Sequence, residues 1–172
     1  MLRPILRYGQ PPLHQPASVV TVFDDRLQRL IDDMIETMYA APGIGLAATQ
    51  VGVPLRVFVV DLSVGRTPSD LVAMVNPEIV DRDGMQLEEE GCLSVPGFNA
   101  TVVRPAKLTL RGVSRDEQPQ TIEATGLLAR AFQHELDHLI GKVFLDRMTD
   151  MSTLTQLHEF HQYWQKEPSS VI

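Results

Sequence analysis

The sequence predicts an α+β fold in which small mixed or antiparallel β-sheets pack around one buried central helix. Segment 125–140 has a helical pattern with apolar residues on both sides, so this helix is expected to be buried nearly all round. Strand-like runs precede it at 56–62 and 72–76. Two further runs, 106–113 and 119–124, predict a hairpin. A length of 172 residues suits one domain with a substantial core.

The composition argues against several classes of protein. A formal net charge of −7 argues against a dedicated DNA-binding surface. The single cysteine, Cys92, cannot form an internal disulfide, which indicates a reducing compartment such as the cytoplasm. No apolar run approaches the roughly 18 residues of a membrane span, and residues 1–9 lack the apolar centre of a secretion signal.

The N-terminal quarter is expected to contain an irregular arm and one amphipathic helix. Residues 10–18 are rich in proline and predict the arm. Residues 24–40 predict the helix, with Asp24 as the N-cap and Pro42 as part of its end. Its apolar stripe consists of Leu27, Leu30, Ile31, Met34, Ile35 and Met38.

Segment 43–50 is rich in small residues and allows three interpretations. It could pack tightly against the preceding helix. It could cradle a phosphate, although it lacks the lysine and the helix start of a P-loop. It could also let the backbone approach a substrate closely. The segment reads Gly43-Ile44-Gly45-Leu46-Ala47-Ala48-Thr49-Gln50.

The segments around Cys92 and at the end of the chain are less regular. Residues 79–89 are weakly strand-like and run into the acidic stretch 88–90, which would disfavour a thiolate at Cys92 unless a metal ion offset it. Residues 95–99 are expected to continue as a loop. A packing helix is expected over about 152–165.

The predicted helix at 125–140, with Thr125 as a possible N-cap and Gly141 as a possible C-cap, carries the pattern H-E-x-x-H. His134 and His138 are four residues apart, so both imidazoles can reach one metal ion from the same helix face. Glu135 is offset from that face and suits proton transfer better than ligation.

The third metal ligand remains open at this point. Phe144 stands where an extended H-E-x-x-H pattern would have another histidine. Glu159 could serve as the ligand of a metalloprotease. Cys92 with the two histidines would leave one position for water or substrate. A metal-stabilised binding domain with a closed, non-catalytic site is a further alternative.

Three motifs together resemble the peptide deformylase (polypeptide deformylase) family. They occupy residues 43–50, 90–94 and 133–138, in the same order as in that family. The resemblance implies a single catalytic domain over 1–172, with a peripheral tail at about 150–172. It also implies a hydrolase that removes the formyl group from the N-formylmethionine of nascent polypeptides and releases formate.

The resemblance also assigns roles to residues. Metal ligands would be Cys92, His134 and His138; catalytic groups would be Glu135 for the proton and Gln50 with the N–H of Leu93 for the oxyanion. Substrate would be bound by Ile44, Gly45, Gly91, Leu127, Arg130 and Ala131. Glu90 and Arg104 would form a structural pair.

Two positions depart from the family pattern as the resemblance presents it. Arg130 stands where many members have an apolar residue, so we expect it at the rim of the methionine pocket. The arginine that many bacterial members carry near Asn99 is missing, which leaves a contact to the substrate backbone in doubt.

The resemblance implies Fe²⁺ as the native ion, whereas intrinsic affinity favours Zn²⁺, and Ni²⁺ or Co²⁺ could also substitute. It further implies nascent formylmethionyl peptides as substrates, proximity to the ribosome, a bacterial cytoplasmic location and a monomer that needs neither DNA nor membrane.

Overall fold

The computed structural model describes residues 1–156, so Glu159 and most of the helix expected over about 152–165 lie outside the described residues. The start of that helix is not observed, because Met151–Thr153 is a short 3-10 helix and Thr155–Gln156 is a strand. No helix in the described part of the chain combines the length and the apolar character needed to cross a membrane. The predicted α+β class is confirmed.

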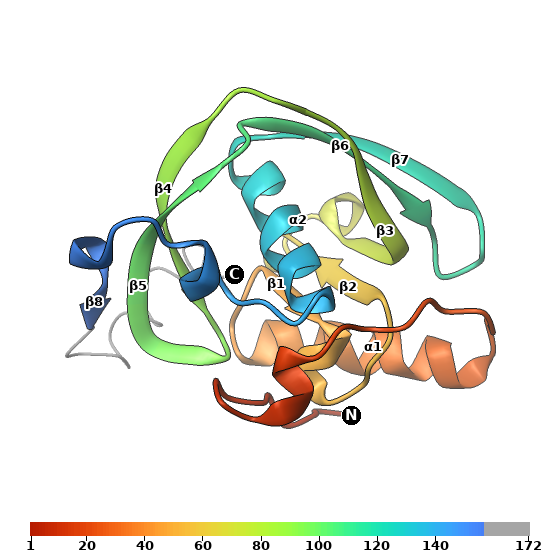
Figure 1. Cartoon of the computed structure of the whole chain (residues 1–172). Coiled ribbons are helices and arrows are strands. Elements are labelled where there is room, and N and C mark those ends of the chain that lie inside the picture. The colour runs from red at the N-terminus through yellow and green to blue at the C-terminus, as the bar shows by residue number, and fades with distance from the viewer. Residues whose placement is uncertain (157–172) are drawn as a thin grey trace.

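All strand pairs between the named strands are antiparallel (Figure 1). A five-stranded sheet has the order β1 (Gly45–Ala47), β2 (Val57–Val60), β3 (Val72–Asp83), β6 (Lys107–Val113) and β7 (Pro119–Thr125). A second sheet has the order β4 (Gln86–Cys92), β5 (Val95–Arg104) and β8 (Thr155–Gln156). The predicted hairpin is therefore present as β6 and β7.

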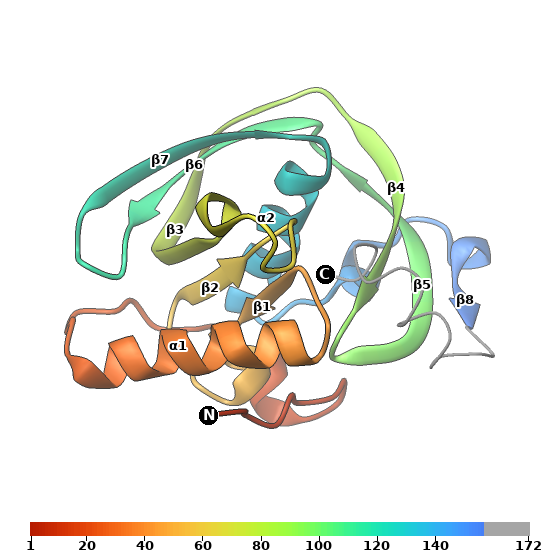
Figure 2. The ribbon, with the colours of Figure 1, turned by 180° about the vertical axis from the view of Figure 1, so that it is seen from behind.

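The two long helices, α1 (Asp25–Ala40) and α2 (Gly126–Leu139), pack on opposite faces of β2. Successive strand residues point to opposite faces, so Val57 and Val59 join the core beside α1, whereas Phe58 and Val60 join the core beside α2. Figure 2 shows α1 running across the outside of β1 and β2, with α2 behind them. Because α2 is enclosed by sheet, ten of its fourteen residues are buried, as predicted.

The helix ends agree only in part with the sequence expectations. The Asp24 side chain accepts hydrogen bonds from the N–H groups of Arg26 and Leu27, both at 3.1 Å, and so caps α1 as predicted. Thr125 occupies the N-cap position of α2, but its side chain makes no capping hydrogen bond. Gly141 follows the C-cap residue Ile140 and adopts a φ of +80°.

The prediction of a loop at 95–99 is wrong, because β5 (Val95–Arg104) begins at Val95. The chain reverses directly after Cys92, which pairs with Val95, and Asn99 then pairs with Gly91. Residues 96–98 bulge out between these two pairs, which explains why their sequence lacks strand alternation. β3 also extends to Asp83, well beyond the predicted end at 76.

Candidate metal centre

Three potential ligand atoms converge on one point beside α2. The Cys92 Sγ lies 3.4 Å from the His138 Nε2, which lies 3.2 Å from the His134 Nε2. All three ligand atoms lie within 4.8 Å of one another, and all three residues are buried. They form the one group of three or more such residues among residues 1–156 that could hold a metal ion.

Two elements bring these atoms together. His134 and His138 are one turn apart on α2, as the spacing predicts. Cys92 is the last residue of β4, where the chain turns into β5, and the backbone N–H groups of Ser94 and Val95 are directed at its sulfur. A site formed by one helix and one tight turn is held rigidly.

Glu90 orients the first imidazole. Its Oε1 lies 2.9 Å from the His134 Nδ1. A proton on Nδ1 satisfies that contact and leaves the lone pair of Nε2 directed towards Cys92 and His138. Carboxylate support of this kind is usual for metal-binding histidines.

A buried ion-pair network surrounds Glu90. Arg104 donates to both of its carboxylate oxygens at 2.9 Å, so the expected pair is present. Arg104 also contacts Asp137 at 2.6 Å, and Asp137 pairs with Arg147 at 2.9 Å. Burial raises the pKa of Glu90, but hydrogen bonds from His134 and Arg104 outweigh that effect and lower it to about 2.

Arg130 joins the same network, which corrects the expectation of a position at the pocket rim. Its side chain is buried, its guanidinium pairs with Glu90, and it donates to the Val102 carbonyl oxygen at 3.0 Å. The guanidinium lies beside Glu90, the carboxylate that also contacts His134, because this buried carboxylate compensates its charge.

Glu135 has the opposite surroundings. It is fully buried, and neither carboxylate oxygen has a hydrogen-bond partner among residues 1–156. Burial first, and the charge of Glu90 second, raise the pKa of Glu135 well above its ordinary value. A Cβ at Gly45 would lie 2.4 Å from the Glu135 Oε1, so the absent side chain provides the room that this carboxylate occupies.

Gln50 is held beside the sulfur. Its Oε1 accepts from the Ala47 N–H at 2.9 Å, while its Nε2 lies 3.1 Å from the Ser94 Oγ and 3.7 Å from the Cys92 Sγ. The amide donor is therefore directed at the ligand cluster, next to the backbone that leads into Leu93.

Two of the remaining predicted substrate residues, Ile44 and Ala131, belong to the hydrophobic core beside α2. Ile44 and Ala131 are fully buried, and Gly91 directly precedes Cys92. Leu127, in the first turn of α2, is 40% exposed. Sequence reasoning missed Asp137 and Ser94, although both lie inside the quoted motifs and their polar character was the available signal.

The donor set fits a divalent metal ion. Burial raises the pKa of the Cys92 thiol, so the thiolate needs a cation beside it. Burial, followed by His134, lowers the pKa of His138 well below its ordinary value, which keeps its imidazole neutral. One thiolate and two neutral imidazoles form a three-ligand set typical of catalytic sites.

Comparison with known proteins agrees with this chemistry. The family model described as polypeptide deformylase matches residues 2–153. A peptide deformylase of Acidobacterium capsulatum is 48% identical over 149 residues, covering 87% of this chain and 88% of that protein.

Solved structures give the same result. A peptide deformylase from Legionella pneumophila shares 44% identity with a TM-score of 0.85, and the match covers 89% of each chain. One from Synechococcus elongatus, in complex with actinonin, shares 36% identity with a TM-score of 0.84, covering 97% of this chain and 90% of that one.

Enzymes of this kind are metal-dependent hydrolases that remove the formyl group from the N-terminal formylmethionine of nascent polypeptides. The family model spans nearly the whole described chain, and the relatives match at high identity and coverage. The chain therefore belongs to the polypeptide deformylase family.

Proposed function

We propose that Cys92, His134 and His138 hold one divalent metal ion and that Glu135 transfers the proton when the formyl group is hydrolysed. The convergence of the three ligand atoms within 4.8 Å, beside a buried carboxylate without a protein partner, is the observation that supports this assignment most strongly. A divalent ion held there supplies Lewis acidity, which acidifies water and polarises a carbonyl group. We propose Fe²⁺ as the native ion and Zn²⁺, Ni²⁺ or Co²⁺ as substitutes.

Glu135 acts first as a base and then as an acid. Burial raises its pKa, so it binds a proton more strongly than an exposed carboxylate does, which suits a group that must accept a proton and later deliver it. It takes the proton of the attacking water and later delivers it to the nitrogen of the departing N-terminal amine. The absence of a competing hydrogen bond within residues 1–156 leaves both carboxylate oxygens available for that transfer.

Gln50 and the N–H of Leu93 stabilise the negative charge that develops on the formyl oxygen. A side-chain amide and a backbone N–H donate hydrogen bonds without titrating, so they serve at any working pH. The bond from the Ala47 N–H to the Gln50 Oε1 fixes the amide so that its donor end is directed at the cluster. This anchoring supports the assignment because a donor that is already oriented costs no reorganisation during the reaction.

The peptide lies in an extended conformation between two strand edges. β1 pairs with β2 and β4 pairs with β5, and each is an edge strand of its sheet in the described part of the chain. Gly45 on β1 and Gly91 on β4 offer backbone groups for strand-like pairing with the substrate.

The methionine side chain enters a pocket formed by Ile44 and by Leu127 and Ala131 on α2. The last two residues are four apart and precede His134 on the same helix face, so all three side chains line one stripe. Arg130 precedes Ala131 on α2, and its pair with Glu90 holds the helix turn that carries this pocket residue.

The two alternatives make different predictions for the metal. A metalloprotease that used Glu159 would keep its ion in Cys92→Ala, whereas a centre that includes Cys92 would lose it. A non-catalytic metal-stabilised domain would give no formate. We further propose a monomer that works in the cytoplasm near the ribosome. Formate release from formyl-Met-Ala-Ser, measured together with metal content, tests the assignment of the site.

A further inference from the structure

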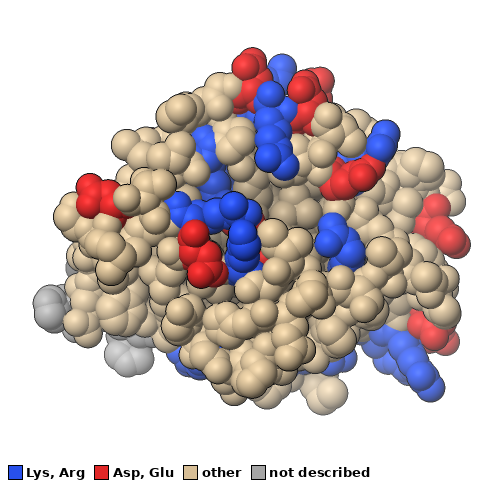
Figure 3. Space-filling model, viewed as in Figure 1, with Lys and Arg blue, Asp and Glu red and all other residues tan. Residues whose placement is uncertain are grey.

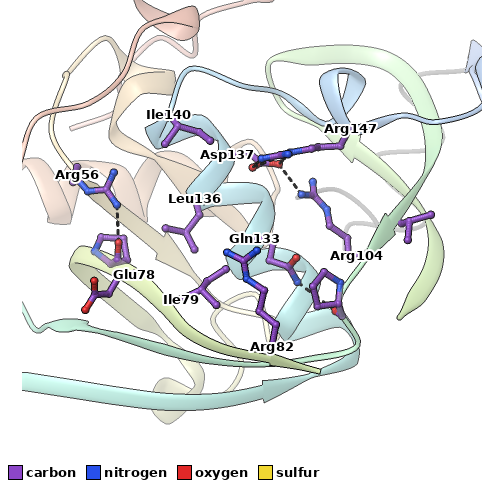
Figure 4. Close-up of a pocket in the computed structure, with 13 residues that line it drawn as sticks. Arg56, Glu78, Ile79, Arg82, Arg104, Gln133, Leu136, Asp137, Ile140 and Arg147 are labelled. Carbon is purple, nitrogen blue, oxygen red and sulfur yellow. Dashed lines mark hydrogen bonds and ion pairs between the residues drawn. The ribbon is translucent and has the colours of Figure 1, made fainter. Parts of the chain in front are cut away.

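We propose that a hollow on the back of α2 binds a small ligand carrying a phosphate group, through Arg56, Arg82 and Arg147. The hollow has a volume of about 330 Å³, and α2 contributes Gln133 and Asp137 to its lining (Figure 4). Gln133 and Asp137 each directly precede one of the two histidines and so lie about 100° round the helix from it. Leu136 and Ile140, which also line the hollow, lie further round, so the hollow is on a different face of α2 from the proposed metal ligands.

Positive charge exceeds negative charge around the hollow. Four arginines line it together with two carboxylates, Glu78 and Asp137. Glu78 is already paired with Arg111, and Asp137 is shared between Arg104 and Arg147. The excess is local, because the whole chain has a formal charge of −7. In Figure 3 the Lys and Arg side chains gather near the middle of this face, with few acidic side chains among them.

Two of the guanidinium groups have no carboxylate partner in the part of the chain that the structure describes. Within residues 1–156 the Arg82 guanidinium makes no hydrogen bond or ion pair, and it extends towards Gln133 in Figure 4. The Arg56 guanidinium donates to the Pro77 carbonyl oxygen at 2.7 Å and forms no ion pair with any described residue. Arg147 pairs with Asp137, but its side chain is still 40% exposed.

The arrangement suits a phosphate group better than other anions. The three arginines come from separate segments, before β2, within β3 and in the 3-10 helix Phe144–Arg147, and they surround one concavity. A phosphate presents three acceptor oxygens that several guanidinium forks can share, whereas a carboxylate presents two.

The size and lining indicate a small molecule rather than a polymer. About 330 Å³ lies at the lower end of the range for small-ligand pockets. Apolar side chains of Ile79, Leu136 and Ile140 also line the hollow and leave a surface for the organic part of a phosphomonoester. An RNA strand would instead need an extended basic stripe along which its backbone could run.

Titration followed by NMR tests the proposal on the diamagnetic zinc-loaded protein. Inorganic phosphate and adenosine 5′-monophosphate are added separately at constant ionic strength. We expect saturable shifts of the side-chain N–H signals of Arg56, Arg82 and Arg147. Arg82→Ala should weaken the affinity for both probes at least tenfold, and Arg82→Lys should recover only part of it, because lysine keeps the charge without the planar fork.

The matched control is Arg29→Ala, which removes another exposed arginine, on α1, and changes the net charge by the same amount. Its affinity for phosphate should equal that of the unmodified protein. Equal weakening in both variants would show attraction by overall charge and overturn the proposal. Shifts that do not saturate would overturn the proposal as well. So would a protein that binds a short single-stranded RNA but neither inorganic phosphate nor adenosine 5′-monophosphate. Thermal unfolding of each variant verifies that it is folded.

Discussion

Glu90 and Glu135 are both fully buried beside the proposed metal ligands, yet their surroundings differ completely. Glu90 contacts two arginines and one imidazole, whereas Glu135 has no hydrogen-bond partner among the described residues. The pKa of Glu90 is accordingly lowered to about 2, and the pKa of Glu135 is raised.

The difference supports two separate roles for the same residue type in the proposed site. A carboxylate surrounded by cations stays ionised and holds its neighbours in place. A carboxylate without partners binds a proton more readily and is free to exchange it. We therefore expect mutation of Glu135 to affect the rate and mutation of Glu90 to affect stability.

The largest effect is expected for Glu135→Gln. The amide has the same shape but cannot accept and return a proton, so formate release should fall by about 10²–10⁴-fold. Stability should not decrease, because the variant removes an unpaired buried carboxylate. Formate assays, metal quantitation and urea unfolding of the same preparation check this. Full activity with bound metal would exclude the proposed role.

Glu90→Gln should have the second largest effect, and on different quantities. Losing the carboxylate leaves the buried charge of Arg130 without its carboxylate partner and leaves Arg104 with Asp137 alone, which should reduce the free energy of unfolding by about 3–5 kcal/mol. His134 also loses its orienting partner, so metal affinity should fall by about 10–100-fold. Urea unfolding and metal competition measure the two effects. A variant of unchanged stability would show that the network contributes little.

The pH dependence of stability should separate the two carboxylates further. The pKa of Glu90 lies below its ordinary value of 4.5, so its contribution is present above about pH 4.5 and is lost as the pH falls towards about 2. The unfolding free energy of the metal-free protein should therefore decrease over this range, by an amount on the order of 3 kcal/mol from this group. Glu90→Gln should show a shallower decrease. Parallel curves for the two proteins would contradict the assignment.

The smallest effect is expected for Arg130→Ile. Glu90 keeps Arg104, so we expect a loss of about 1–3 kcal/mol in unfolding free energy, together with an altered preference among formylated peptides. The matched control is Arg111→Ile, which removes an exposed ion pair with Glu78 and should cost about 0–1 kcal/mol. Equal losses in both variants would argue against a special role of burial at Arg130. An unchanged preference among formylated peptides would show that Arg130 does not affect substrate specificity.

The local parts of the site could be predicted from the sequence. The spacing of His134 and His138 specifies one helix face, and Cys92 is the single cysteine in a recognisable motif. The pair of Glu90 with Arg104 was predicted from the resemblance to the family.

Contacts between distant segments could not be predicted in this way. Arg130 reaches Glu90 across forty positions, and no local pattern distinguishes a buried guanidinium from one at a pocket rim. Strand β5 was missed because its first residues bulge, and its pairing depends on β4 and β8. The hollow behind α2 likewise is lined by residues from five separate segments of the chain.

X-ray absorption spectroscopy of the metal-loaded protein tests the central assignment most directly. Ligation by Cys92, His134 and His138 predicts one sulfur at about 2.3 Å and two imidazole nitrogens at about 2.0–2.1 Å from a zinc ion. Cys92→Ala should lose the sulfur signal together with most of the metal. A spectrum of the unmodified protein without sulfur, or with full metal retention in Cys92→Ala, would contradict the account.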